Sequence, residues 1–274
     1  MIPQTRKYFV VTVHFGAHAP TDGLVASLLQ GTSQPHKVVI IDHAEQAYAL
    51  SSRADLIHII RPQQNNGYAG GLNLGLGALT SMGANAQDIV ICLNNDASLA
   101  PSSLEQMKTW ADKQAGLYLA GPVMGRLNYI SGRTHLFPKS LPSSSWTQAM
   151  YVHGSCLIAP MQVYANAKGL PEHFFMYWED VAFSARAVAT GARLKRIPNL
   201  TVTHPDDHPV SSGQVFYLVR NGAWYLEHHT PGLWRIYWYL LNRLRYVWHI
   251  IAGKPSVATA LKAARQNKLE TMSS

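Results

Sequence analysis

Two adjacent carboxylates, Glu179 and Asp180, follow five apolar or aromatic residues at positions 174–178. A carboxylate in a partly dry pocket has a raised pKa and can act as a general base. The same pair in the first turn of a helix would also complement the helix dipole, with the aromatic residues in the core. The segment alone favours neither interpretation.

A second chemical signal lies at Asn94, Asn95 and Asp96, where an apolar run stops abruptly. Strands often end in polar turns, so a turn is one interpretation, and a metal site built on Asp96 is the other. His204, which follows the short apolar segment 201–203, would be a further ligand if it faces Asp96. Carboxylate and neutral imidazole together suit Mn²⁺.

A third signal is the glycine-rich segment 65–75, which contains Gly70, Gly71 and Asn73. It lacks the Gly-Lys-Ser/Thr ending of a P-loop, and residues 61–64 separate it from the preceding strand, unlike a dinucleotide fingerprint. It still offers close backbone approach and a helix N-terminus, which favour anions. We therefore expect a diphosphate near Gly70 and Gly71.

The elements around these signals indicate an open, mostly parallel α/β sheet. Apolar, β-branched runs predict strands at 8–13, 36–42, 56–60 and 88–93, alternating with helices that end near 30 and span 71–82 and 101–114. In such sheets ligands bind beyond the carboxyl ends of the strands. His14, Asp42 and the segment 94–96 all stand at predicted strand ends.

The second half is less regular. We expect a loop over 121–150, a strand over 152–158, a helix over 179–190, short strands at 194–197 and 200–203, and helices over 213–229 and 233–251.

Charge and cysteine content narrow the functional class. The formal charge is +8, but Lys and Arg are scattered through the first two thirds of the chain, which argues against nucleic acid. Cys92 and Cys156 lie in apolar surroundings, as expected of buried thiols in a reducing compartment. The N-terminal apolar run is too short to span a membrane, so we expect a cytoplasmic protein.

The last predicted helix is amphipathic. Its apolar stripe comprises Leu233, Ile236, Tyr237, Leu240, Leu241, Leu244, Val247, Trp248 and Ile251. The segment is too charged to span a bilayer and is typical of an interfacial helix. The alternatives are that the stripe packs on the catalytic domain or on a second subunit in a homodimer.

Together these motifs resemble the inverting nucleotide-sugar glycosyltransferases of family 2, which have the GT-A fold. The similarity is strongest to the bacterial rhamnosyltransferase-like branch that builds surface polysaccharides such as O-antigen and capsule. It rests on the opening strands with Asp42, the match of 65–75 to N-x-G-[FY]-[AG]-G-[GA]-x-N-x-G, the D-x-D variant at 94–96, and segment 174–180 followed by His204 and Arg220.

The resemblance implies a role for each matching residue. Asp180 would deprotonate the acceptor hydroxyl, with Glu179 beside it, and Asp96 would bind Mg²⁺ or Mn²⁺ on the donor diphosphate, with His204 as a further ligand. Contacts to the nucleotide-sugar donor would come from His14, Asp42, Gly70, Gly71, Asn73, Asn94, Asn95 and Arg220. The acceptor would be a saccharide, often lipid-linked, so that the protein would lie at the inner face of the cytoplasmic membrane and contact it through 233–251.

The chain departs from the family pattern at two positions. Ala182 replaces a frequent acidic residue, and Asn94 leaves Asp96 as the lone carboxylate of its motif, so metal affinity without nucleotide should be poor. We expect a catalytic domain at 1–229 and a helical extension at 230–274. The alternatives are an inactive sugar-nucleotide or glycan-binding protein and a nucleotidyltransferase, whose basic glycine-rich loop the segment 14–20 does not supply.

Overall fold

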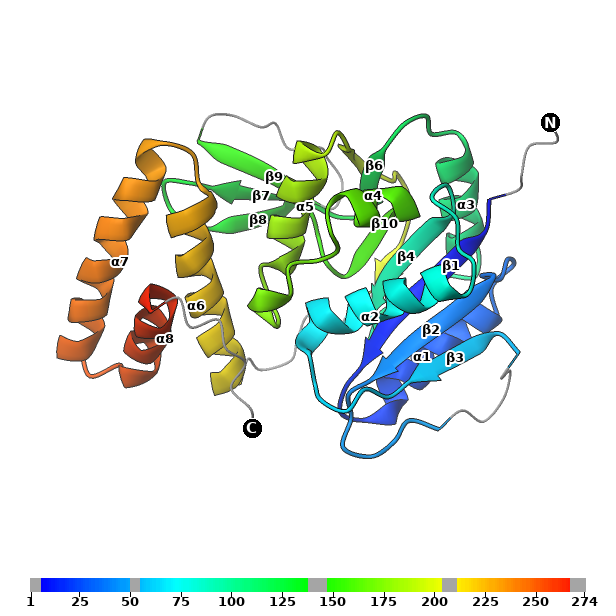
Figure 1. Cartoon of the computed structure of the whole chain (residues 1–274), viewed down its shortest axis with the longest axis horizontal. Coiled ribbons are helices and arrows are strands. Elements are labelled where there is room, and N and C mark those ends of the chain that lie inside the picture. The colour runs from blue at the N-terminus through cyan, green and yellow to red at the C-terminus, as the bar shows by residue number, and fades with distance from the viewer. Residues whose placement is uncertain (1–5, 50–54, 138–146, 204–210, 267–274) are drawn as a thin grey trace.

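A seven-stranded sheet forms the centre of the molecule (Figure 1), seen in a computed structural model that describes residues 6–49, 55–137, 147–203 and 211–266. In spatial order its strands are β11 (Arg193–Arg196), β6 (Tyr118–Gly121), β10 (Cys156–Pro160), β4 (Ile89–Asn94), β1 (Tyr8–His14), β2 (Lys37–Asp42) and β3 (Ile57–Ile60). All pairings are parallel except those of β10 with β4 and β6. This confirms the predicted mostly parallel α/β sheet.

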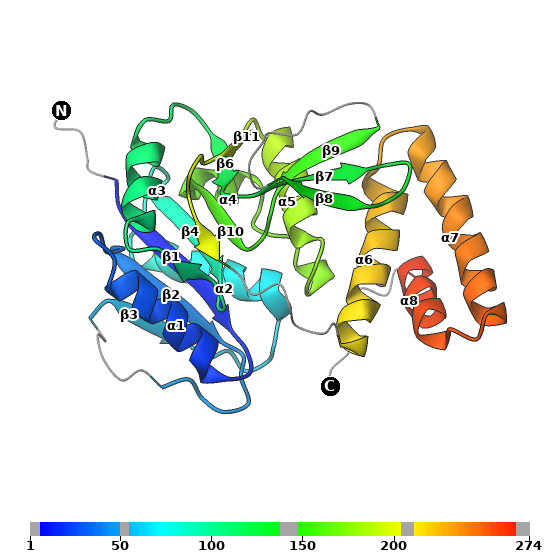
Figure 2. The same ribbon diagram turned by 180° about the vertical axis from the view of Figure 1, so that it is seen from behind.

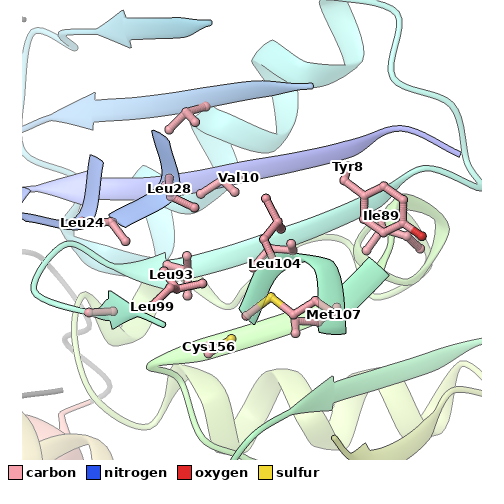
Figure 3. Packing of buried hydrophobic residues seen from close by; sticks show 14 of the residues in the cluster. Tyr8, Val10, Leu24, Leu28, Ile89, Leu93, Leu99, Leu104, Met107 and Cys156 are labelled. Carbon is pink, nitrogen blue, oxygen red and sulfur yellow. The ribbon is translucent and has the colours of Figure 1, made fainter. Parts of the chain in front are cut away.

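The central strands are buried on both faces, which explains their nearly continuous apolar runs. Alternate residues of each strand point into two separate cores. Figure 3 shows one core, where Val10 and Leu93 pack with residues from helices α1 (His18–Leu29) and α3 (Ser103–Asp112). The other core is covered by α2 (Gly67–Ser81), α4 (Met161–Asn166) and α5 (Glu179–Ala189).

Helix α2 begins at Gly67, four residues earlier than predicted. Gly70 and Gly71 therefore lie inside the helix and not at its N-terminus. A Cβ atom on Gly71 would lie 2.7 Å from Cγ2 of Val13, and one on Gly75 would lie 2.3 Å from Cγ1 of Val11. These two glycines are needed because the helix packs tightly against β1.

The predicted loop over 121–150 is wrong, because this region contains strands. A three-stranded antiparallel sheet is formed by β7 (Met124–Asn128), β8 (Thr134–Phe137) and β9 (Gln148–Val152), with β7 in the centre. The predicted strand over 152–158 is in fact divided, since β9 ends at Val152 and β10 begins at Cys156. The turn between them, residues 153–155, contributes to the pocket described below.

A short two-stranded sheet joins distant parts of the chain. Strand β5 (Ser98–Leu99) pairs with β12 (Val202–Thr203), and Thr203 lies opposite Ser98. The chain that leads into His204 is thereby placed next to the segment that contains Asp96. His204 itself lies outside the described residues.

Three C-terminal helices pack together at one end of the molecule (Figure 1), namely α6 (Ser212–His229), α7 (Leu233–Ile251) and α8 (Pro255–Arg265). Ser211 and Gln214 form a capping box at the start of α6. Helix α8 was not predicted. No helix in the described part of the chain has the length and apolar character needed to cross a membrane.

Candidate active site

A pocket of about 860 Å³ joins the two strongest chemical signals of the sequence. Asn94, Asn95 and Asp96 line it from the end of β4, and Glu179 and Asp180 line it from the first turn of α5. Asn95 and Asp180 thus line one cavity although they lie 85 positions apart in the chain. A position beyond the ends of parallel strands is where open α/β sheets bind ligands.

The Asp180 carboxylate is held by backbone amides. Gly154 N–H donates to its Oδ2 at 2.9 Å and Val181 N–H donates to its Oδ1 at 2.8 Å. Burial raises the pKa of Asp180 above its ordinary value, although the nearby His153 and these amides act in the opposite direction. A carboxyl group with a raised pKa is suited to accept a proton near neutral pH.

The neighbouring carboxyl of Glu179 is more deeply buried, with 6% of its surface exposed. Its Oε2 finds no hydrogen-bond partner among the described residues. Burial, and then the charge of Asp180, raises its pKa to about 8. His153 and three backbone amides lower the pKa of Asp180, whereas a single backbone amide lowers that of Glu179, so we assign the proton to Glu179 and the negative charge to Asp180 near neutral pH.

The aromatic segment before α5 has an unusual backbone. Phe175, Tyr177 and Trp178 have positive φ angles of 63°, 64° and 73°. Such conformations cost of order 1–3 kcal/mol each for non-glycine residues and persist only where the surroundings enforce them. Phe175, Tyr177 and Trp178 all line the pocket, so the strain lies at the candidate site.

Asn221 and Arg220 of α6 hold this strained segment in place. Asn221 Nδ2 donates to the carbonyls of Phe174, Met176 and Tyr177 at 2.7–3.0 Å. Arg220 is 2% exposed, and its Nη2 donates to the Phe174 carbonyl at 3.2 Å. The guanidinium predicted to reach the donor therefore lies behind the pocket wall and is absent from the pocket lining.

Asp42 and His14 also lie beneath the pocket. Asp42 is buried and accepts hydrogen bonds from Tyr48 N–H at 2.9 Å and from Arg61 Nη1 at 2.7 Å. Burial alone would raise its pKa, but these donors outweigh it, so that the pKa is lowered. His14 Nδ1 contacts Thr21 Oγ1 at 2.6 Å.

Thr21 joins this lower layer to the pocket lining. Its hydroxyl oxygen also accepts a hydrogen bond from Nδ2 of Asn95 at 3.1 Å. The side chain of His14 is thus connected to the pocket lining through Thr21 and Asn95, and its carbonyl accepts from the backbone amide of His43 at 2.9 Å.

The glycine segment contributes different residues from those predicted. Asn65, Gly67 and Tyr68 line the pocket, whereas the predicted Gly70, Gly71 and Asn73 do not. Asn73 Nδ2 donates to the carbonyl of Leu170 at 2.8 Å and to Glu172 Oε1 at 2.7 Å. Its side chain thus ties α2 to the segment before the aromatic run.

Sequence reasoning missed several parts of the lining, among them His43 and the turn 153–155. Neither ring nitrogen of His43 has a hydrogen-bond partner among the described residues, and burial lowers its pKa. Its place directly after Asp42, at a predicted strand end, was a usable signal. The turn 153–155 gave no such signal, because the sequence predicts a single strand over 152–158.

Oxygen ligands for a cation are present but few. Asp96 lies in the pocket with the side-chain amide of Asn94. Across the described ranges, no three His, Cys, Asp or Glu side chains come close enough together to hold a metal ion. This donor set suits a hard cation such as Mg²⁺ or Mn²⁺ only if a ligand supplies most of the coordinating oxygens.

Comparison with known proteins identifies the class. Residues 9–165, more than half of the chain, match the model of glycosyl transferase family 2. The chain therefore belongs to this family and is a glycosyltransferase, as the motifs predicted. A relative from Mycobacterium tuberculosis, N-acetylglucosaminyl-diphospho-decaprenol L-rhamnosyltransferase, is 23% identical over 300 residues, covering 95% of this chain and 96% of the relative.

Solved structures confirm the GT-A fold. A mannosyltransferase from Pyrobaculum calidifontis in complex with GDP-Man and Mn²⁺ aligns with a TM-score of 0.53 and 13% identity, over 97% of this chain and 88% of that one. GalNAc-T7 with UDP, GalNAc and Mn²⁺ aligns with a TM-score of 0.58 and 13% identity over 81% of this chain. The aligned part spans about half of the GalNAc-T7 chain, 51%.

Proposed function

We propose that this glycosyltransferase inverts the anomeric centre as it transfers a sugar from a nucleoside-diphosphate donor to a hydroxyl of a lipid-linked saccharide acceptor in surface polysaccharide synthesis. The names of its relatives support the substrate classes. The mycobacterial relative is named for an acceptor on a diphospho-decaprenol carrier, and the mannosyltransferase structure contains GDP-Man. The alignment with the rhamnosyltransferase relative covers nearly the whole chain, which supports substrates of the same two kinds, a sugar donor and a lipid-linked acceptor.

One observation carries the proposal: Asp180 and Asp96 line the same pocket from two different elements. Inverting transfer needs a base on the acceptor side and stabilisation of negative charge on the departing diphosphate. Asp180 has a raised pKa and fixed orientation, which suit the base. Asp96 stands at the end of β4 in the family's metal-binding motif, which suits the diphosphate side.

The proposed step is an in-line displacement. As the acceptor oxygen forms its bond to the anomeric carbon, the Asp180 carboxylate takes the hydroxyl proton. The bond between that carbon and the diphosphate oxygen breaks, and its electron pair leaves with the nucleoside diphosphate. Glu179 keeps its own proton, because a second charge beside Asp180 would be desolvated and repelled.

We propose that Asp96 and Asn94 would hold a divalent cation, Mg²⁺ or Mn²⁺, together with the donor diphosphate and with His204 as a further ligand. Such a cation, when bound, offsets the charge of the leaving diphosphate. The poor protein donor set suits a cation that binds with the nucleotide and hardly at all without it. The pairing of Thr203 with Ser98 supports the inclusion of His204.

The other residues predicted to contact the nucleotide-sugar donor fall into two groups according to where they lie. We propose that Asn94 and Asn95 contact the donor directly, since both line the pocket. His14, Asp42, Gly70, Gly71, Asn73 and Arg220 lie behind the lining, and we propose that they position its walls. Residues 1–229 would carry the chemistry at the inner face of the cytoplasmic membrane, with 230–274 as an extension.

A donor screen tests this function. The full chain would be incubated with Mn²⁺ and a panel of UDP-, GDP- and dTDP-linked sugars, and thermal stabilisation and transfer to a polyprenyl-diphosphate-linked N-acetylglucosamine would be measured. We expect one nucleotide class to stabilise the protein and one sugar to be transferred with inversion. Retention of the anomeric configuration in the product would contradict the proposed step.

A further inference from the structure

Helix α7 has two faces, and its apolar stripe is turned to solvent. The side chains of Trp238 and Asn242 are buried on the opposite face. Trp238 Nε1 donates to the carbonyl of Tyr129 at 2.7 Å, and Asn242 Nδ2 donates to Glu227 Oε1 at 2.9 Å. The exposed stripe on the other face, which we call the α7 stripe, comprises Leu233, Ile236, Tyr237, Leu240, Leu244, Val247, Trp248 and Ile251; Tyr239 and Ile250, outside this stripe, are exposed as well.

Exposure of the α7 stripe ranges from 39% at Tyr237 to 82% at Leu233. The alternative that this stripe packs on the catalytic domain is therefore contradicted for all of its members except Leu241, which is half-buried. In Figure 2, α7 is the outermost helix at its end of the molecule, so nothing described lies beyond it. A contiguous apolar surface of this kind marks a contact with a protein or a membrane.

The charge around the α7 stripe distinguishes these two partners. Residues 228–265 contain six Lys or Arg residues and no Asp or Glu. Two of these cations lie over aromatic rings of α7, Arg243 over Tyr239 at 3.1 Å and Lys254 over Trp248 at 5.6 Å from the ring centroids. Arg243 also forms an ion pair with Glu227. The four exposed cations of this segment, Arg235, Lys254, Lys262 and Arg265, would repel those of a second copy and attract anionic lipid headgroups.

We propose that the α7 stripe docks on an anionic phospholipid bilayer, with the helix axis in the plane of the interface. The apolar side chains would enter the boundary between headgroups and acyl chains, and the flanking cations would contact lipid phosphates. Trp248 and Tyr237 are the residue types enriched at this depth. The apolar face and the basic residues of this segment would both favour binding to the bilayer.

The hairpin between β7 and β8 connects this surface to the pocket. Tyr237 and Trp238 of α7 both donate to carbonyls of its turn, at Ile130 (3.2 Å) and Tyr129 (2.7 Å). Gly132 in the same turn packs so closely on Trp238 that a Cβ would lie 2.6 Å from the indole ring. Strand β8 then supplies Thr134 and Leu136 to the pocket lining.

The exposed apolar residues continue along this hairpin, with Ile130 51% and Leu136 49% exposed. Docking through the α7 stripe would thus bring one wall of the pocket close to the bilayer. If the proposed function is right, a lipid-linked acceptor would reach the pocket along this wall without leaving the membrane. The docking itself does not depend on that function.

Vesicle flotation with the full chain tests the proposal. Vesicles of phosphatidylglycerol and phosphatidylcholine would be compared with vesicles of phosphatidylcholine alone. We expect binding to the anionic vesicles that weakens at high salt. The double variant Leu240→Gln, Leu244→Gln should reduce binding by about tenfold or more, because two exposed leucines no longer enter the lipid.

A matched double variant, Val188→Gln with Met82→Gln, removes exposed apolar side chains elsewhere and should leave vesicle binding unchanged. Equal binding by both double variants would overturn the proposal. So would a concentration-dependent dimer that is lost in the α7 variant while the wild type ignores vesicles. Donor stabilisation by UDP-, GDP- or dTDP-sugars should persist in the α7 variant, which separates a failure of docking from a failure of the proposed function.

Discussion

The backbone amide of Gly154 donates a hydrogen bond of 2.9 Å to Oδ2 of Asp180. This contact joins the turn between β9 and β10 to the first turn of α5, and a Cβ at 154 would make a tight contact, 3.2 Å from the Cβ of Asp180. The carbonyl of Gly154 in turn accepts from the Tyr68 hydroxyl at 3.2 Å. One turn therefore fixes the orientation of the proposed base and of a neighbouring pocket residue.

Glu179→Gln should change how stability depends on pH. In the folded protein the pKa of Glu179 is raised to about 8 from an ordinary value of 4.5, so the folded state binds its proton more tightly than the unfolded state. Its contribution is complete below pH 4.5 and is lost as pH rises through 8. We expect the stability difference between variant and wild type to change by up to a few kcal/mol in this window, in favour of the variant at high pH.

Urea unfolding at pH 5, 7 and 9 would measure this difference. Glu45→Gln is the matched control, because Glu45 is exposed and its substitution should give no such pH-dependent difference. A Glu179→Gln protein whose stability follows the wild type in parallel across the three pH values would show that Glu179 is not a buried protonated acid.

Asn221→Ala should lower both stability and turnover. The variant loses hydrogen bonds from Nδ2 to the carbonyls of Phe174, Met176 and Tyr177, and the strained segment is no longer held. We expect a loss of about 2–4 kcal/mol in the free energy of unfolding. The turnover number should fall more than donor affinity does, because the segment leads directly into Asp180.

Asn242→Ala separates these two effects. Asn242 is also a buried asparagine of the C-terminal helices, but its partners are Ala223, Glu227 and Arg245, away from the pocket lining. This variant should lose stability and keep its turnover number at temperatures where it is folded. Equal turnover losses in Asn221→Ala and Asn242→Ala would rule out a positioning role for Asn221.

Asp96→Ala should remove the dependence of nucleotide binding on metal. If Asp96 is the main protein carboxylate on the cation, Mn²⁺ should strengthen binding of a nucleoside diphosphate to the wild type by at least about tenfold more than to the variant. Calorimetry with and without Mn²⁺ gives the two affinities. Asp112→Ala, at the far end of α3, serves as control, and an unchanged Mn²⁺ effect in Asp96→Ala would exclude Asp96 as a ligand.

The central sheet could be predicted well, because strands that are buried on both faces appear in the sequence as nearly continuous apolar runs. In β2 and in β4, four of the six residues are buried Val, Ile or Leu. The small sheet of β7, β8 and β9 was missed for the opposite reason. Strand β8 is only four residues long and largely exposed, and its stability depends on pairing with β7, which propensity does not encode.

The site was predictable where it lies at strand ends and at the start of α5. Asp96 and Asp180 each belong to a motif in which polar residues follow an apolar run, and the structure places both in one pocket. The burial of Arg220 could not be read from the chain, because its partners are backbone carbonyls contributed by a distant segment. The same holds for Gly154, whose role depends on a backbone amide.

Asp180 is the proposed base, and its carboxylate is the group that must take up the acceptor proton. Asp180→Asn preserves the size of the side chain and keeps one oxygen, which can accept from the amide of Gly154 or from that of Val181, but it cannot take up the acceptor proton. Transfer and donor binding should therefore separate in this variant. Glu179→Gln is its matched comparison, since Glu179 keeps its proton in the proposed step.

The decisive measurement is the rate of sugar transfer by Asp180→Asn, with donor affinity determined on the same preparation. We predict a fall of about 10²–10⁴-fold in turnover with donor affinity within about twofold of wild type, and a much smaller fall for Glu179→Gln. Wild-type turnover in Asp180→Asn, or loss of turnover in Glu179→Gln alone, would contradict the assignment of the base.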